Sequence, residues 1–196
     1  LTGIKISKMN TIQRQEKTFR VLTGKTVVIT GGTSGVGRAA AAAFALEGCN
    51  VVIGARGQKG LDETISLCHD LGAVALGVST DVSNMEEVKN LAELALQFNG
   101  RIDIWVNNAG VMASGKFEDI PVETLDQVVK TNLLGFLHGS YAVLPIFKRQ
   151  KEGVLINNVS IGGWMPAPYS TVYSSTKFGI RGMVEGLQGE VSDEPN

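Results

Sequence analysis

The chain has 196 residues, 43% of them hydrophobic and 19% charged, which is typical of one globular domain large enough to bury a core. A formal net charge of -1 excludes the strongly basic surface that recruits nucleic acid or an anionic membrane. Two cysteines without a CxxC pair and two histidines are too few for a zinc cage or a disulfide framework, so we expect no metal site and a reducing, cytoplasmic setting.

The first 25 residues are basic, because they carry six of the 18 lysines and arginines and only one acid. We interpret residues 1–23 as a flexible, solvated leader, with an address signal as the alternative. The longest apolar run in the chain, residues 39–46, is far shorter than the ~18 residues of a membrane span. We therefore expect no membrane-spanning segment.

From residue 24 onward, short β-branched segments alternate with longer segments whose apolar residues recur at helical spacing. The expected strands are residues 25–30, 50–54, 73–78, 102–107 and 153–160. The expected helices are residues 35–47, 59–71 and 85–98, two helices within residues 122–151, and a last helix from about 171 to 191. The strands are almost continuously apolar, which indicates burial on both faces. The pattern predicts an α/β fold, a Rossmann-type doubly wound parallel sheet with helices on both faces, over residues 24–196.

A glycine-rich turn, TGGTSGVG at residues 30–37, follows the first expected strand and opens an alanine-rich helix. Such a turn presents backbone N–H groups and the positive end of the helix dipole to a pyrophosphate. We expect Gly31 to permit the turn, Gly35 to let the phosphates approach, and Gly37 to allow the helix to pack closely on the strand. This context favours nucleotide binding over a merely structural tight turn.

The second expected strand leads into Ala55 and Arg56. Folds of this type that prefer NAD place a carboxylate near this point for the ribose 2′-hydroxyl, whereas an arginine accommodates a 2′-phosphate. Ala55 supplies no acid and Arg56 supplies a planar cation, so the sequence favours NADP(H) over NAD(H). The alternative is an arginine that only faces solvent at the end of the strand.

Tyr173 and Lys177 lie four residues apart near the start of the last expected helix, so both project from one helix face. A lysine ammonium favours the phenolate form of a nearby tyrosine, which makes Tyr173 a candidate general acid/base. Ser160 ends the fifth expected strand, at the edge where open α/β sheets assemble their sites. Its hydroxyl can donate to a carbonyl oxygen that gains negative charge.

Two further polar segments are candidates for the same site. Residues 107–110, NNAG, end the fourth expected strand. Asn132 lies within a helical segment, where asparagine has poor propensity. For Asn132, a satisfied core or capping amide is the alternative to a role in the site.

In their order along the chain, these motifs resemble those of short-chain dehydrogenases/reductases: TGxxxGxG at residues 30–37, NNAG at 107–110, a helical Asn132, Ser160, and YxxxK at 173–177. The resemblance implies an NAD(P)-dependent oxidoreductase that transfers a hydride between nicotinamide and a small carbonyl or alcohol substrate, without a metal. It also implies a homodimer or homotetramer.

By this resemblance, Asp81 and Val82 hold the adenine, Asn108 lines the cofactor, and Asn132 positions a water in a proton relay through Lys177. The implied catalytic residues are Asn132, Ser160, Tyr173 and Lys177. The expected cofactor-binding residues are Gly31, Thr33, Ser34, Gly35, Val36, Gly37, Arg56, Asp81, Val82, Asn108, Ala109, Gly110, Tyr173 and Lys177.

Members of this family continue past the YxxxK helix into further strands, so we expect the chain to be an incomplete version of a longer protein. Without those strands the fifth strand would be a bare apolar edge. Residues 164–169, WMPAPY, are expected to form one apolar wall of the substrate pocket, with loop packing as the alternative. The main rival function is a non-catalytic NADP-binding sensor or scaffold. A methyltransferase also carries a glycine-rich turn, but it has no role for the YxxxK helix.

Overall fold

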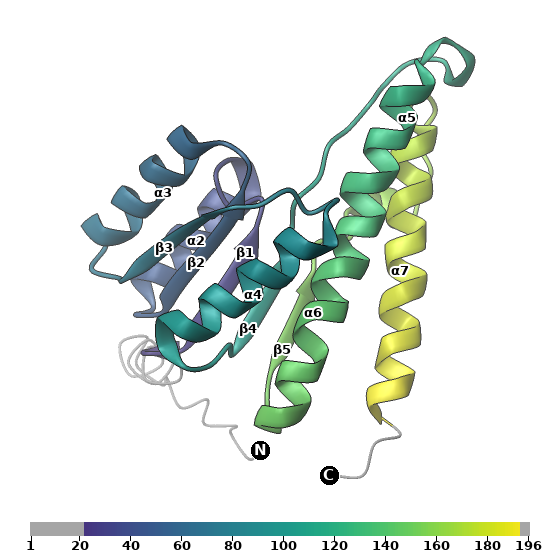
Figure 1. The fold of residues 1–196 in the computed structure, drawn as a ribbon. Helices are drawn as coiled ribbons and strands as arrows, with labels where there is room; N and C mark the ends of the chain where they lie inside the picture. Colours follow the sequence, from purple (N-terminus) through teal and green to yellow (C-terminus); the bar gives the residue numbers. More distant parts are fainter. Residues whose placement is uncertain (1–21, 193–196) are drawn as a thin grey trace, which may run out of the picture.

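The computed structural model describes residues 22–192, which form an α/β fold around one parallel sheet (Figure 1). Within these residues the sheet has five strands in the order β3-β2-β1-β4-β5, and every neighbouring pair is parallel. The strands are β1 (Thr26–Thr30), β2 (Asn50–Ala55), β3 (Ala75–Ser79), β4 (Ile104–Asn107) and β5 (Val154–Asn157). The helices are α2 (Gly35–Leu46), α3 (Gln58–Asp70), α4 (Met85–Asn99), α5 (Val122–Val128), α6 (Gly135–Gln150) and α7 (Thr171–Ser192).

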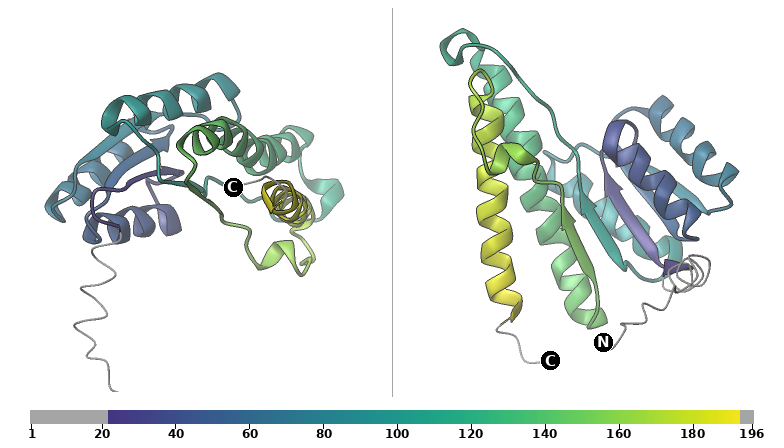
Figure 2. Two further views of the ribbon diagram at one scale, coloured as in Figure 1. Left: turned by 90° about the horizontal axis from the view of Figure 1, so that it is seen from below. Right: turned by 180° about the vertical axis from the view of Figure 1, so that it is seen from behind.

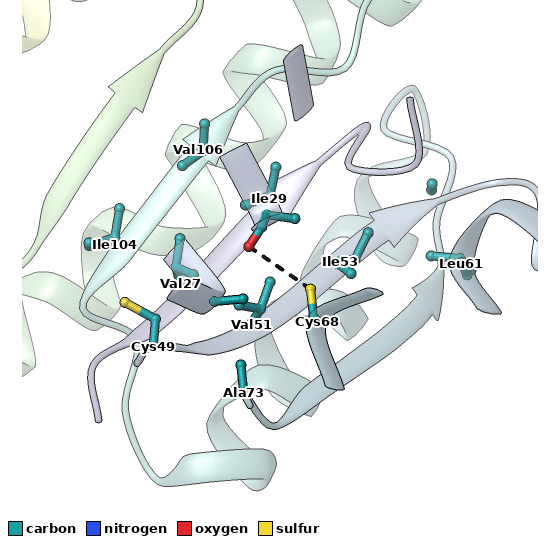
Figure 3. Packing of buried hydrophobic residues seen from close by; sticks show 13 residues of the cluster. Val27, Ile29, Cys49, Val51, Ile53, Leu61, Cys68, Ala73, Ile104 and Val106 are labelled. Carbon is teal, nitrogen blue, oxygen red and sulfur yellow. Dashed lines mark hydrogen bonds between the residues drawn. The ribbon is translucent and has the colours of Figure 1, made fainter. Parts of the chain in front are cut away.

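Helices cover both faces of the sheet (Figure 2). Val27 and Ile29 of β1 pack with residues of α2 and α3, in the cluster shown in Figure 3. Val28, between them, points to the other face and packs with residues of α4 and α6. The alternation follows from the two-residue period of a strand, and it buries β1 on both sides. The predicted doubly wound α/β fold is thereby confirmed.

The strand order reverses beside β1, because the chain first adds β2 and β3 on one side and then β4 and β5 on the other. In open α/β sheets, ligands bind outside the carboxyl ends of the strands at such a reversal. We therefore expect the ligand site at the loops that follow β1 and β4.

One expectation is corrected at the fifth strand. The strand ends at Asn157, so Ser160 lies three residues beyond it instead of at its end. The strand is also an edge of the sheet, and Val154 and Ile156 remain 50% and 40% exposed, which is the bare apolar edge expected for this strand without further strands beside it. An apolar strand is buried only where neighbouring elements cover it, and here β4 pairs with one side alone.

The helical region at residues 122–151 contains the two expected α-helices, joined without a break by a π-helical stretch, Val129–Leu134. π-helical turns are rare and occur frequently at functional sites. Asn132 lies in this stretch. Two short 3₁₀ helices, Phe117–Asp119 and Ile161–Gly163, were not predicted.

The predicted basic leader lies largely outside the described residues. Leu22 packs against the core beside α2, and the Thr23 hydroxyl donates to the Glu47 carbonyl at 3.4 Å, so these two residues belong to the domain. Cys49 and Cys68 are buried free thiols. No helix within residues 22–192 is long and apolar enough to cross a membrane.

Candidate active site

A cavity of about 830 Å³ opens at the carboxyl ends of the strands. All of the predicted site residues line it except Gly37 and Asn132. It is also lined by residues that the sequence analysis did not assign to a site: Gly54, Gly57, Thr80, Val111, Met112, Thr131 and Asn158. Parallel strands present their carboxyl ends at one edge of the sheet, which is why segments as distant as residues 31 and 177 meet there.

The glycine-rich turn packs against the start of the NNAG segment. Gly31 has φ 67°, and a Cβ on it would lie 2.6 Å from Ala109 Cα. A Cβ on Gly37 would collide with the Gly31 carbonyl oxygen and with Asn108 Nδ2. Gly35 has φ 50° and lines the cavity, with no atom within 4 Å of the position a Cβ would take. The turn is thus closed on its inner side and open toward the cavity.

This open side fits the phosphates of a dinucleotide. Helix α2 begins at Gly35, has no acidic residue in its first turn, and receives no capping hydrogen bond from the Ser34 side chain. The first N–H groups of the helix and its positive dipole end are therefore available to an anion. Arg56 adds a cation to the wall of the same cavity.

Asp81 is a carboxylate held in place on the cavity wall. Burial raises the pKa of the Asp81 carboxyl, but hydrogen bonds from Ser83 Oγ at 2.7 Å and Ser83 N at 2.9 Å, together with the positive charge of Arg56, outweigh it. The net pKa is lowered from its ordinary value. Asp81 is therefore ionised at neutral pH and is electrostatically coupled to Arg56.

Two residues of α6 position Val82, the neighbour of Asp81. A Cβ on Gly135 would lie 2.7 Å from Val82 Cγ2, so α6 approaches this segment closely. His138 Nδ1 lies 2.8 Å from the Val82 carbonyl oxygen, and it donates because a carbonyl only accepts. Neither residue was expected at the site from the sequence, since no local pattern connects residues 56 positions apart.

The two adjacent asparagines after β4 point in different directions. Asn108 lines the cavity, and its Nδ2 donates to the carbonyl oxygens of Thr30 and Gly31, each at 3.1 Å. Asn107 is buried, and its Nδ2 donates to Asn157 Oδ1 at 2.9 Å. Only Asn108 is therefore placed to contact a ligand in the cavity.

Asn132 is 0% exposed and connects Val111 to α7. Its Oδ1 accepts from Val111 N at 2.8 Å, and its Nδ2 donates to Val111 O at 2.9 Å and to Thr176 Oγ1 at 3.3 Å. These bonds match the satisfied core amide that the sequence left as an alternative. Lys177 Nζ donates to the Asn158 carbonyl at 2.9 Å, and the relay that the resemblance implies between Asn132 and Lys177 would pass through a water.

Tyr173 and Lys177 both line the cavity from the first turns of α7. Lys177 is 4% exposed, and its Nζ lies 4.7 Å from the centroid of the Phe136 ring and 5.6 Å from that of the Tyr173 ring. Burial lowers the pKa of Lys177 from 10.5 to about 8. The ammonium form still predominates at neutral pH, which leaves a buried cation beside the phenol ring.

Ser160 has a strained backbone, with φ 71° and ψ 158°. Residues other than glycine rarely adopt this region, which costs on the order of 1–3 kcal/mol and is found mostly at functional sites. A Cβ on Gly162 would lie 3.1 Å from Tyr173 Cε1 and 3.8 Å from Ser160 Oγ. Gly162 therefore lets the serine hydroxyl and the phenol ring approach each other, and the Gly-Gly pair after Ser160 was the signal for it in the sequence.

The apolar segment at residues 164–169 does not line this cavity, which corrects the expectation that it forms a wall of the substrate pocket. Trp164 instead stacks against Arg181 of α7, with the guanidinium carbon 3.8 Å from the ring centroid. Residues 166–168 line a separate hollow of about 480 Å³ beside α7. Within residues 22–192, no group of three or more His, Cys, Asp or Glu side chains is arranged to hold a metal ion.

Known proteins of similar sequence are oxidoreductases. The family described as short chain dehydrogenase matches residues 25–194. An uncharacterized oxidoreductase of Staphylococcus aureus (strain USA300) is 39% identical over 173 residues, which cover 88% of this chain and 74% of that protein.

Solved structures of the same fold contain either dinucleotide. A short chain dehydrogenase/reductase from Burkholderia phymatum in complex with NAD has a TM-score of 0.84 and 33% identity, and the match covers 86% of this chain and 60% of that chain. A variant of actinorhodin polyketide ketoreductase with NADPH has a TM-score of 0.84 and 30% identity, over 87% of this chain and 66% of that chain. This chain thus spans less than two thirds of the length of these two proteins. The family match, the parallel sheet and the cavity at its carboxyl edge show that this chain belongs to the short-chain dehydrogenase/reductase family of NAD(P)-binding oxidoreductases.

Proposed function

We propose that this chain is an NADP(H)-preferring oxidoreductase that interconverts a small carbonyl compound and an alcohol, with Tyr173 as the acid/base residue. The observation that carries the proposal is the pair of Tyr173 and Lys177, which share the wall of one cavity with Ser160. A buried cation 5.6 Å from the centroid of a phenol ring supports proton transfer by that phenol.

The residues of the chain would control the oxygen atom and the proton of the reaction. Bound NADPH would supply the hydride to the carbonyl carbon. The Tyr173 hydroxyl would give its proton to the carbonyl oxygen, while the Ser160 hydroxyl donates a hydrogen bond to that oxygen as it gains negative charge. The Lys177 cation would stabilise the phenolate that remains on Tyr173. In alcohol oxidation Tyr173 would accept the proton instead.

In the proposed site, Asn132 has a structural role, since it holds two segments of the cavity wall together. Its bonds to Val111 and Thr176 connect the segment after NNAG with the helix that carries Tyr173 and Lys177. The water relay that the family resemblance implies for Asn132 and Lys177 remains a proposal.

The preference for NADP(H) rests on Arg56. Arg56 lines the cavity, and Ala55 before it provides no carboxylate to hold a ribose 2′-hydroxyl. Asp81 and Val82 on the same wall would hold the adenine, and the glycine-rich turn with Thr33, Ser34 and Val36 would hold the phosphates. The solved relatives include both an NAD and an NADPH complex.

The test combines binding with turnover. Calorimetric titration should show tighter binding of NADPH than of NADH, and a panel of ketones and aldehydes should include a substrate that consumes NADPH. Tyr173→Phe serves as the matched control, because it should bind NADPH but consume it at least about 10²-fold more slowly. Tight binding without turnover of any carbonyl compound would favour the sensor or scaffold function instead.

The proposal includes a homodimer or homotetramer that forms through α6 and α7. Leu137 and Tyr141 of α6 are 40% and 70% exposed, and Phe178 of α7 is 40% exposed, which is apolar surface of the kind that subunit contacts bury. Light scattering should detect the oligomer, and Tyr141→Lys should weaken it. A stable monomer at micromolar concentration would contradict this part.

A cytoplasmic location is also proposed, supported by the two buried free thiols.

A further inference from the structure

Asn158 stands where β4, β5 and α7 meet at the wall of the cavity. We propose that Asn158 is a positioning residue that joins Lys177 to the glycine-rich turn through one chain of hydrogen bonds. The inference rests on the proposed function insofar as Lys177 serves catalysis. Asn158 itself belongs to neither the NNAG nor the YxxxK motif.

The first half of the chain of bonds runs from the glycine-rich turn to the Asn158 side chain. Asn108 Nδ2 donates to Thr30 O and to Gly31 O, and because backbone carbonyls only accept, both N–H bonds of this amide are used. Asn108 Oδ1 is thereby left as an acceptor, and Asn158 Nδ2 donates to it at 3.0 Å. The carbonyls of the turn thus determine the direction of each bond.

The second half runs through the backbone of Asn158. Its N–H donates to the Asn107 carbonyl at 3.0 Å, which continues the pairing of β4 with β5 one residue past the end of the strand. Its carbonyl accepts from Lys177 Nζ at 2.9 Å. Among residues 22–192 this is the hydrogen-bond acceptor that Lys177 uses, and its other close partners are the rings of Phe136 and Tyr173. The position of the ammonium therefore depends on the position of the Asn158 carbonyl.

The side-chain bond matters because it ties the start of the segment after β5 to the NNAG side of the cavity, whereas residues 161–163 pack on α7. The strand is an edge of the sheet, so β4 is its one neighbouring strand. Two residues beyond Asn158, the chain enters the strained conformation of Ser160. Loss of the bond to Asn108 should let this segment shift and displace the acceptor of Lys177 and the Ser160 hydroxyl together. A displacement of about 1 Å in an active site can cost about 10²-fold in rate.

The test compares Asn158→Leu, which keeps the size and removes the donor, with Gln150→Leu. The Gln150 amide also fastens backbone, since it accepts from Ile102 N at 3.1 Å and donates to Ile102 O at 2.6 Å, but it lies at the opposite end of β4. Both substitutions should lower the Tm. Asn158→Leu alone should weaken NADPH binding by about tenfold or more and lower kcat by about 10- to 100-fold. Calorimetry measures the first effect and steady-state kinetics the second.

Asn158→Asp provides a second variant in case the leucine variant does not fold. It keeps the size and polarity but sets a carboxylate oxygen against Asn108 Oδ1, so it should show the same losses. If either variant binds NADPH and turns over substrate like the wild type, with only the Tm lowered, Asn158 has a purely structural role and the proposal is overturned.

A measurement on the ligand-free protein separates this proposal from the proposed function. The Asn158 side-chain amide proton that is donated to Asn108 Oδ1 should exchange slowly with solvent in NMR spectra of the wild type and of Gln150→Leu, and rapidly in Asn108→Leu, which lacks that acceptor. If the wild type binds no dinucleotide, the proposed function fails, while faster exchange in Asn108→Leu still supports the bond between the two asparagines. Exchange that is equal in all three proteins overturns the inference.

Discussion

The Lys177 ammonium lies over the Tyr173 ring, 5.6 Å from its centroid and one turn further along α7. The spacing of four residues places both side chains on one face of the helix. Because Lys177 is buried, its charge is weakly screened by water and acts on the phenol at short range. The Lys177 cation is therefore placed to stabilise the phenolate form of Tyr173.

Tyr173→Phe should lower kcat by about 10²- to 10⁴-fold, the range of a lost general acid, while the Kd for NADPH stays nearly unchanged. Lys177→Met should damage both quantities, because Lys177 would stabilise the phenolate and is also one of the residues expected to bind the cofactor. Steady-state kinetics with a good carbonyl substrate and calorimetry with NADPH test the difference. Turnover at the wild-type rate in Tyr173→Phe would show that another group donates the proton.

Lys177 should make stability depend on pH above neutrality. Burial lowers the pKa of Lys177 from 10.5 to about 8, so between these values the unfolded chain binds more protons than the folded chain. The destabilising effect of the buried charge is thus fully present below pH 8 and disappears as the pH rises to 10.5.

We expect the free energy of unfolding of the wild type to rise relative to that of Lys177→Met across this window, by about 1.4 kcal/mol for each unit of pKa difference. Urea unfolding of both proteins at several pH values measures the difference and cancels the titration of all other groups. A difference that stays constant from pH 7 to pH 10.5 would contradict the lowered pKa of Lys177.

Arg56→Asp should shift cofactor preference from NADPH toward NADH. A charge-assisted hydrogen bond is replaced by repulsion, so NADPH binding should weaken by at least about 10- to 100-fold, while NADH binding changes little. Lys89→Asp is the matched control, since it makes the same change of charge on the exposed face of α4, where Lys89 pairs with Glu86. Preference of the unmodified protein for NADH would show that Arg56 does not recognise a 2′-phosphate.

Ser160→Gly should stabilise the protein and impair it as an enzyme. Glycine adopts φ 71° without the steric cost that serine has, so the free energy of unfolding should rise by about 1 kcal/mol. Loss of the hydroxyl should lower kcat by about 10²-fold. Ser160→Ala removes the same hydroxyl and keeps the strain, so it should lose activity without the gain in stability. Equal stability of the two variants would argue against strain at this residue.

Gly37→Ala should destabilise the fold, because the new methyl group collides with the Gly31 carbonyl and Asn108 Nδ2. Overpacking of this kind costs on the order of 1–3 kcal/mol. Gly182→Ala, in α7, has no atom within 4 Å of the added methyl group and should stabilise the helix by about 0.5–1 kcal/mol. Urea unfolding of both variants tests the contrast. Equal effects would mean that α2 does not pack on the turn as described.

Features with a local signal could be predicted from the sequence by itself. The strand, glycine-rich turn and helix at residues 26–46 follow from apolar runs and glycine positions. The shared helix face of Tyr173 and Lys177 follows from spacing alone. The alternation of strands and helices also predicts that loops after the parallel strands meet at one edge, which is why most of the expected residues line one cavity.

Contacts between distant residues were decided by the tertiary structure. His138 meets Val82, and Asn158 meets Asn108, across 56 and 50 positions. The end of β5 at Asn157 was missed for a related reason, because a β-branched residue recurs at Val159 after the two asparagines, while the strand itself ends at the first of them. Helical or strand periodicity arises from the geometry of a few neighbouring residues. Hydrogen bonds and burial depend on which elements the whole fold brings together, and no local pattern in the chain carries that information.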